Sequence, residues 1–108
     1  MDARVNPKDL GDALTATTPV TVIDVRGPRD FEAGHVPGAI NVPMAKLPGA
    51  LRKMARDTEI VTYCNMHHPG ESRGERAQAL LLEKGYLAHV LEGGFPAWVA
   101  AGLPVEQG

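Results

Sequence analysis

The stretch EIVTYCNMHHPGESRGERAQALLLEKG, residues 59–85, indicates the fold class of this chain. Its opening run at 59–64 is rich in β-branched and aromatic residues, which is typical of a strand buried on both faces. A helical pattern covers residues 73–84, and Gly85 is well placed to end that helix. A polar loop with two histidines lies between them. The stretch therefore predicts a strand, a loop and a helix in succession.

The rest of the chain repeats this alternation of strands and helices. Strand patterns cover residues 3–5, 20–26, 39–42 and 88–94, and helical patterns cover residues 7–16, 30–33, 47–56 and 95–101. Such an order favours a parallel sheet with helices on both faces. Ligands of these sheets bind at the carboxyl ends of the strands. We therefore expect one α/β domain over residues 1–108, with its site near the loop after residue 64.

The composition argues against several classes of protein. The chain has 108 residues, 44% of them hydrophobic and 22% charged, which suits a single globular domain with its own core. A net charge of -2 provides no large basic surface for nucleic acid or an anionic membrane. No apolar run approaches the roughly 20 residues that span a bilayer. The opening MDARVNPKDL lacks the apolar segment of a secretory signal, and one cysteine cannot form an internal disulfide. We expect a cytoplasmic protein without nucleic-acid or membrane partners.

Cys64 is the only cysteine, and it lies between the predicted strand and the predicted helix. A thiolate is the reactive form of cysteine, and nearby positive charge favours it. A helix N-terminus supplies N–H groups and partial positive charge, and a loop entering the helix can turn its own N–H groups inward. Arg73, at the mouth of the loop, would add a fixed positive charge and bidentate hydrogen bonds to an oxyanion. We therefore predict that Cys64 is a nucleophile at the floor of an anion-binding loop.

Other residues of this loop have narrower expected roles. Gly70 and Gly74 would relieve the backbone where the loop curls. Ser72 would cap the helix or donate a hydrogen bond to the anion. Glu71 is a candidate general acid, but it would repel an anion if it faced inward. The residues expected to line the substrate site are Asn65, Met66, His67, His68, Gly70, Glu71, Ser72, Arg73, Gly74 and, from a neighbouring strand end, Asp24.

Two other interpretations of Cys64 stay open. Cysteines are among the most buried residue types, and most are inert, so Cys64 could be a structural thiol. Thiolate and imidazole also bind zinc or copper, and His67 and His68 lie close by in sequence, with His35 as a possible addition. A structural zinc site uses four ligands, and the chain has no second cysteine. We therefore expect no metal and no cofactor, and we interpret His89 as a structural or surface residue.

Several motifs resemble the rhodanese-like domain family. VIDVRGPRDFEAGHVPGAINVP, at residues 22–43, looks like the family signature. IVTYC, LLLEKGY, HVLEGGFPAW and GLPVE are similar to the rest of the family, so the resemblance covers nearly the whole chain. It implies an α/β domain with a central five-stranded parallel sheet flanked by helices on both faces.

The resemblance also implies a sulfurtransferase. Cys64 would take a sulfane sulfur from a donor such as thiosulfate, hold it as a persulfide, and pass it to cyanide or a thiol. The partners would be a small sulfur-containing anion or thiol, with an acceptor protein as a further possibility. Arg73 matches the arginine that closes the active-site loop, and Asp24 matches the acid at the strand end beside it. Arg26 and Glu32 match a charged pair that braces the domain.

The loop departs from the family pattern. Eight residues lie between Cys64 and Arg73, where the usual loop has four and the phosphatase and arsenate-reductase branch has five. The longer loop predicts either a wider pocket, which would admit a bulkier thiol, or a loop that folds His67 and His68 over the sulfur. A phosphate ester needs a general acid, and only Glu71 is a candidate, so sulfur transfer is favoured. A non-catalytic module for protein binding or redox sensing, and a phosphatase or arsenate reductase, stay as alternatives. The segment from His35 to Ala39 matches a packing turn.

Overall fold

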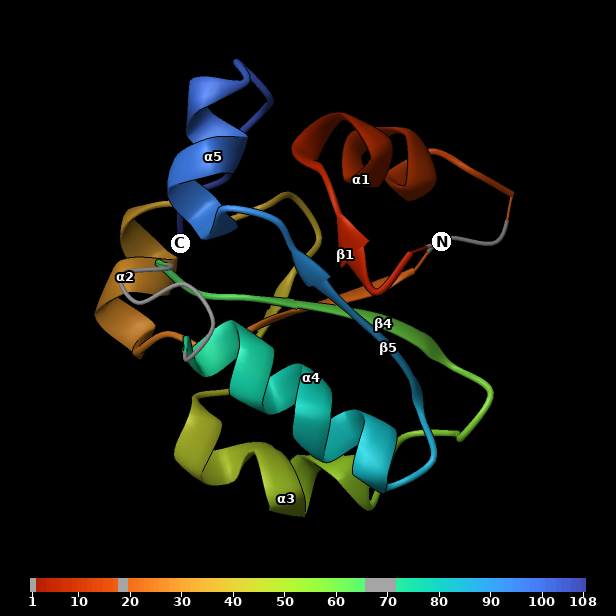
Figure 1. The fold of residues 1–108 in the computed structure, drawn as a ribbon. Coiled ribbons are helices and arrows are strands. Elements are labelled where there is room, and N and C mark those ends of the chain that lie inside the picture. The colour runs from red at the N-terminus through yellow and green to blue at the C-terminus, as the bar shows by residue number, and fades with distance from the viewer. Residues whose placement is uncertain (1, 18–19, 66–71) are drawn as a thin grey trace.

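The computed structural model describes residues 2–17, 20–65 and 72–108. Its strands form one parallel five-stranded sheet in the order β1-β5-β4-β2-β3, which confirms the predicted sheet (Figure 1). The middle strand of this order is β4, and it ends at Tyr63, directly before Cys64. The strands are β1 (Arg4–Val5), β2 (Thr21–Asp24), β3 (Ile40–Asn41), β4 (Glu59–Tyr63) and β5 (Leu87–Leu91).

Helices cover both faces of this sheet. Figure 1 shows α1 and α5 on one face and α3 and α4 on the other, with α2 beside the carboxyl ends of the strands. None of the helices in the described part of the chain is long and apolar enough to cross a membrane. The helices are α1 (Pro7–Leu14), α2 (Pro28–Ala33), the 3-10 turn η1 (Met44–Lys46), α3 (Leu47–Leu51), α4 (Arg73–Glu83) and α5 (Gly94–Ala100).

Each face of the sheet has its own apolar core. Neighbouring residues of one strand alternate between the two cores: Val61 belongs to the core beneath α1 and α5, whereas Ile60 belongs to the core beneath α3 and α4. Val22 and Ile23 divide in the same way. This explains why the central strands read as continuous apolar runs rather than as alternating patterns. Cys64 lies in the core on the side of α3 and α4.

Several predicted elements end earlier than expected, including the helix over 7–16, which ends at Leu14, and the strand over 20–26, which ends at Asp24. The helix expected over 47–56 ends at Leu51. The carbonyl of Leu51 accepts the backbone N–H of Met54 over 3.2 Å in a tighter turn, and it also accepts the Tyr86 hydroxyl over 2.7 Å. The strand with a glycine turn expected over 88–94 is confirmed: β5 ends at Leu91, and Gly93 and Gly94 turn the chain with positive φ values of 76° and 63°.

The first turn of α4 packs directly on the backbone of β4. The Thr62 hydroxyl donates to the carbonyl of Gly74 over 2.7 Å. A Cβ at Gly74 would lie 3.2 Å from the Tyr63 Cα and 3.3 Å from the Cys64 nitrogen. Because both of these are backbone atoms, they cannot move aside as a flexible side chain would. Glycine therefore allows α4 to begin against the residue that follows the middle strand.

We predict that Gly74→Ala lowers the free energy of unfolding by about 1–3 kcal/mol, because the added methyl group displaces α4 from β4. Gly49→Ala is the matched control, since Gly49 lies in α3 and a Cβ there meets no atom within 4 Å. Alanine at that position should be neutral or stabilising by up to about 1 kcal/mol. Urea unfolding followed by the fluorescence of Trp98 measures both variants. Equal effects of the two substitutions would contradict this packing argument.

Candidate active site

Cys64 is held at the carboxyl edge of the sheet from both faces. Its carbonyl accepts a hydrogen bond of 2.9 Å from the N–H of Phe95, at the start of α5. Its own nitrogen lies against Gly74 in the first turn of α4. The side chain is 2% exposed and packs in the core beneath α3 and α4. The backbone of Cys64 is thus fixed between two helices, with its sulfur on the side of α4.

The N-terminus of α4 is closed by a capping box. The Ser72 hydroxyl accepts the N–H of Glu75 over 3.1 Å and donates to the Glu75 carboxylate over 2.7 Å, while the Ser72 N–H donates to the same carboxylate over 3.2 Å. Arg4 of β1 forms an ion pair with Glu75 at 3.0 Å. Ser72 therefore has the capping role that its residue type suggested. Its hydroxyl hydrogen is directed to Glu75 and not toward an anion.

The structure describes only part of the predicted loop. Arg73 and Gly74 are the first two residues of α4, and Gly74 lies against the backbone nitrogen of Cys64. Gly74 lies in the helix and allows close packing on β4, which replaces its predicted role in curling the loop. The predicted lining residues that lie outside the described residues are Met66, His67, His68, Gly70 and Glu71.

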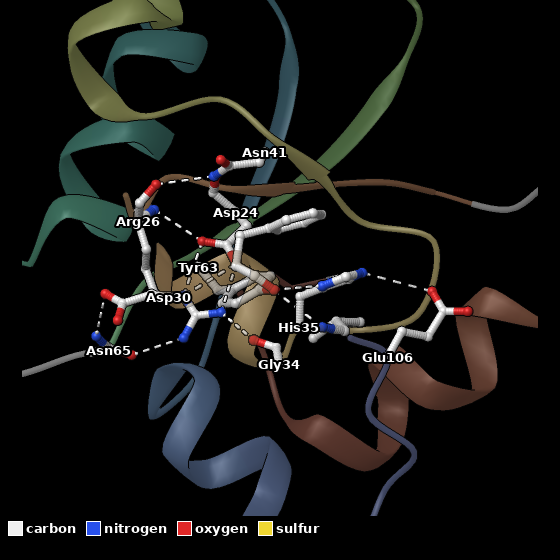
Figure 2. A network of polar contacts seen from close by, with 11 residues as sticks. Asp24, Arg26, Asp30, Gly34, His35, Asn41, Tyr63, Asn65 and Glu106 are labelled. Atoms are coloured by element: carbon white, nitrogen blue, oxygen red, sulfur yellow. Dashed lines mark hydrogen bonds and ion pairs between the residues drawn. The ribbon is translucent and has the colours of Figure 1, made fainter. Parts of the chain in front are cut away.

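A buried ion pair lies at the end of β2 (Figure 2). Asp24 is 0% exposed and Arg26 is 3% exposed. The Arg26 guanidinium donates to Oδ1 of Asp24 over 3.0 Å through Nε and to Oδ2 over 2.8 Å through Nη2. It also donates to the carbonyl of Gly34 over 2.6 Å and to Oδ1 of Asn65 over 3.2 Å. One guanidinium thus joins β2, the end of α2 and the residue that follows Cys64.

Two aromatic rings enclose the guanidinium of Arg26. Its central carbon lies 4.4 Å from the ring centroid of Phe95 and 5.5 Å from that of Tyr63. The Tyr63 hydroxyl donates to Oδ2 of Asp24 over 2.7 Å and accepts the N–H of Val36 over 3.1 Å. Desolvation lowers the pKa of Arg26, but the hydrogen bonds and charge of Asp24 outweigh it and raise that pKa overall. The guanidinium therefore stays charged in this buried position.

Asp24 and Arg26 differ from the roles that the family resemblance implied. The resemblance paired Arg26 with Glu32, but the ion pair of Arg26 within the described residues is with Asp24. Glu32 is exposed on α2, and the carbonyl of Gly34 supplies the contact from that segment instead. The carboxylate of Asp24 is fully buried and already bonded to Arg26 and Tyr63. The described contacts of Asp24 therefore orient Arg26, and its contact with a substrate stays a prediction.

Asn65 connects this buried network to the loop after Cys64. Its Oδ1 accepts from Arg26, and its Nδ2 donates to Oδ2 of Asp30 over 3.4 Å, as Figure 2 shows. Asn65 was predicted to line the substrate site, and its described contacts instead tie it to β2 and α2. Arg26 and Tyr63 were not recognised as residues that build the site. The sequence signal that could have identified Arg26 is its position, because it is a cation two residues after Asp24 at the end of a buried strand.

The described histidines have structural contacts. The His35 ring stacks on Phe31 with 3.7 Å between centroids, and its Nδ1 lies 2.7 Å from the Phe31 carbonyl, which agrees with the predicted packing turn. His89 is buried, and its Nδ1 lies 2.7 Å from the carbonyl of Asp2. Within residues 2–17, 20–65 and 72–108, no group of three or more histidine, cysteine or acidic side chains could hold a metal ion.

We predict that Tyr63→Phe changes how stability depends on pH. Burial, and then the charge of Asp24, raise the pKa of Tyr63, so the folded state holds the phenol proton more tightly than the unfolded chain, whose pKa is about 10. This stabilisation is complete below about pH 10 and is lost as the pH rises toward the raised pKa. The Tyr63→Phe variant lacks this pH-dependent stabilisation. Its free energy of unfolding is also lower by about 1–3 kcal/mol at neutral pH, because the hydrogen bonds of the hydroxyl are missing.

Urea unfolding of the unchanged protein and of the variant between about pH 8 and 11 measures this effect. The difference between their free energies of unfolding should be constant up to about pH 10 and should narrow above it. Two curves that stay parallel across that range would contradict the assignment.

Comparisons with known proteins agree with this architecture. The model of the rhodanese-like domain family matches residues 6–101. The HTH-type transcriptional regulator Rv0324 of Mycobacterium tuberculosis is 37% identical over 89 residues, which are 82% of this chain and 38% of that protein. A sulfurtransferase of Allochromatium vinosum is 30% identical over 102 residues, which are 94% of this chain and 92% of that protein.

A solved structure extends the agreement to three dimensions. The rhodanese-related protein of Thermoplasma volcanium has a TM-score of 0.86 and 27% sequence identity, and the match covers 99% of this chain and 100% of that one. The chain thus spans 38% of the length of Rv0324 but nearly all of the sulfurtransferase and of the Thermoplasma volcanium protein. The family match, the five-stranded parallel sheet and the cysteine after its middle strand lead to one conclusion: this chain belongs to the rhodanese-like domain family.

Proposed function

We propose that this protein is a sulfurtransferase that carries a sulfane sulfur on Cys64. The observation that supports this most directly is the position of Cys64, which follows the middle strand and abuts the first turn of α4. Parallel sheets bind their ligands at this edge, and a helix N-terminus favours an anionic sulfur. The sulfurtransferase relative, which matches over 92% of its own length, adds support from the family.

The proposed reaction has two displacement steps. The Cys64 thiolate attacks the sulfane sulfur of a donor such as thiosulfate. The sulfur–sulfur bond of the donor breaks, and sulfite leaves with the electron pair of that bond. A persulfide is then present on Cys64. Cyanide or a thiolate acceptor attacks the outer sulfur, and Cys64 leaves as a thiolate with the electron pair, so the cycle needs no cofactor and no external oxidant.

The start of α4 would supply the positive charge for both steps. A helix cannot pair its first N–H groups with its own carbonyls. In α4, the capping hydroxyl of Ser72 accepts one of these groups, the N–H of Glu75. We assign the N–H groups of Arg73 and Gly74 to the anionic sulfur, and the guanidinium of Arg73 to the oxygens of the donor. The loop residues proposed to line the acceptor side are Met66, His67, His68, Gly70 and Glu71.

The length of the loop bears on the acceptor. Eight residues separate Cys64 from Arg73, which would leave room for a thiol bulkier than cyanide. The proposed partners are therefore a small sulfur-containing anion as donor and a low-molecular-weight thiol or the cysteine of an acceptor protein as recipient. A reducing cytoplasm, where such thiols are kept reduced, is the proposed setting.

Incubation with thiosulfate should add the mass of one sulfur atom to the protein, measured by intact mass spectrometry. Cyanide should remove the added mass, and Cys64→Ala should never gain it. Arg73→Gln should slow sulfur loading roughly 10-fold to 100-fold, because a charge-assisted contact with the donor is lost. Arg76→Gln, which replaces an exposed arginine on the same helix, is the matched control and should load at the normal rate. Absence of a sulfur adduct on Cys64 would contradict the proposal.

The burial of Cys64 supports a second candidate, a rhodanese module that binds a partner protein or senses oxidants without catalysis. Its side chain is 2% exposed and lies among apolar residues, as inert cysteines do. This candidate predicts no sulfur adduct and alkylation of Cys64 by iodoacetamide only as fast as global unfolding exposes it. The sulfurtransferase predicts both loading with sulfur and alkylation of the folded protein.

A further inference from the structure

A cavity of about 290 Å³ lies at the end of α4 that is far from Cys64. Because a helix rises 1.5 Å per residue, the length of α4 separates this cavity from the cap at Ser72 by about 16 Å. Figure 1 shows α3 and the end of α4 on the same face of the sheet. The cavity is therefore distinct from the proposed sulfur-transfer site. Its lining residues are Pro48, Leu51, Arg52, Arg56, Lys84 and Tyr86.

Three of these lining residues are cations, and none of the described lining residues is an acid. Arg52, Arg56 and Lys84 come from two separate segments of the chain and meet at this one cavity. Within the part of the chain that the structure describes, none of the three forms an ion pair or a side-chain hydrogen bond. Three like charges that face one small cavity repel one another, so an anion placed between them would be favourable.

One part of the cavity wall, the contact between Arg56 and Tyr86, is formed before any ligand arrives. The guanidinium carbon of Arg56 lies 5.4 Å from the ring centroid of Tyr86. The Tyr86 hydroxyl donates its one hydrogen to the carbonyl of Leu51 over 2.7 Å, and the carbonyl of Met54 lies 3.0 Å from the same oxygen. Nη1 of Arg56 would lie 3.3 Å from a Cβ at Gly85, so glycine gives the guanidinium its space. Such preorganisation reduces the entropy that a bound anion would cost.

The C-terminal end of α4 does not cancel this positive charge. A helix C-terminus carries partial negative charge on its last carbonyls. Here the carbonyls of Leu80, Leu81 and Leu82 accept backbone N–H groups from residues 84–86 at distances of 3.0–3.2 Å. Lys84, the C-terminal cap residue, adds a full positive charge at the same place. The described lining of the cavity thus carries three cations and no acid.

We propose that this cavity binds a small phosphate-bearing anion. A phosphate group carries up to two negative charges and several acceptor oxygens, which suits two guanidinium groups and an ammonium. A single carboxylate carries one charge and would leave two cations unpaired. The small volume, together with the net charge of -2 for the whole chain, argues against an extended polyanion such as nucleic acid.

Titration of isotopically labelled protein with inorganic pyrophosphate at low salt, followed by NMR, tests this proposal. The amide signals of Gly85 and Tyr86 should shift saturably, with a dissociation constant below about 1 mM. Arg56→Gln should weaken binding at least about fivefold, because one charge-assisted contact is lost. Added salt should weaken binding as well.

Two control variants distinguish binding in this cavity from general attraction to surface charge and from binding at the proposed sulfur-transfer site. Lys53→Gln removes an exposed charge from the same segment that does not line the cavity, and it should change the affinity less than about twofold. Arg73→Gln, at the proposed sulfur-transfer site, should leave pyrophosphate binding intact. The proposal is overturned if no signal saturates, if Lys53→Gln weakens binding as much as Arg56→Gln, or if Arg73→Gln abolishes it. None of these outcomes bears on sulfur loading of Cys64.

Discussion

The contact between Arg26 and Asp24 organises the carboxyl edge of the sheet. Burying two charges costs several kcal/mol each, and their attraction compensates only when hydrogen bonds satisfy the remaining donors and acceptors. Here the guanidinium reaches Asp24, Gly34 and Asn65, and the ring of Phe95 covers it. The main effect of the pair is therefore structural: it holds three segments of the chain in one arrangement. Its contribution to net stability is smaller.

This arrangement determines where Cys64 lies. Tyr63, before it, donates a hydrogen bond to Asp24, and Asn65, after it, accepts one from Arg26. The carbonyl of Cys64 is bonded to Phe95 at the start of α5. The side chain of Cys64 is then left facing α4, whose first turn approaches because residue 74 is a glycine. A reactive group carried at a strand end is held more rigidly than one carried by a loop.

Local sequence patterns predicted the scaffold but not the contacts that complete it. The β-branched runs before Asp24 and Cys64 predicted the central strands, because strands buried on both faces need no polar alternation. The last residue of α3, Leu51, is bonded to the hydroxyl of Tyr86, which lies 35 residues away in sequence. Such a contact leaves no local pattern.

The candidate site was predicted in the same uneven way. The position of Cys64 before a helix followed from the strand and helix patterns, as did the cap at Ser72. The partner of Arg26 did not, because Asp24 and Glu32 are both acids within reach along the chain, and only burial distinguishes them. The role of Gly74 depends on close packing of α4 on β4, where an added Cβ would lie 3.2 Å from the Tyr63 Cα, and residue type alone does not reveal this. The roles of His67 and His68 stay predictions, since they lie outside the described residues.

A double-mutant cycle between Asp24 and Arg26 tests most directly whether this pair organises the site. Asp24→Asn, Arg26→Met and the double variant would be compared with the unchanged protein by urea unfolding. Each single substitution should cost about 3–5 kcal/mol, because it leaves a buried charge without its partner, and the double variant should cost much less than the sum. Single effects that add to within about 0.5 kcal/mol would show that the two residues act independently and would contradict the account.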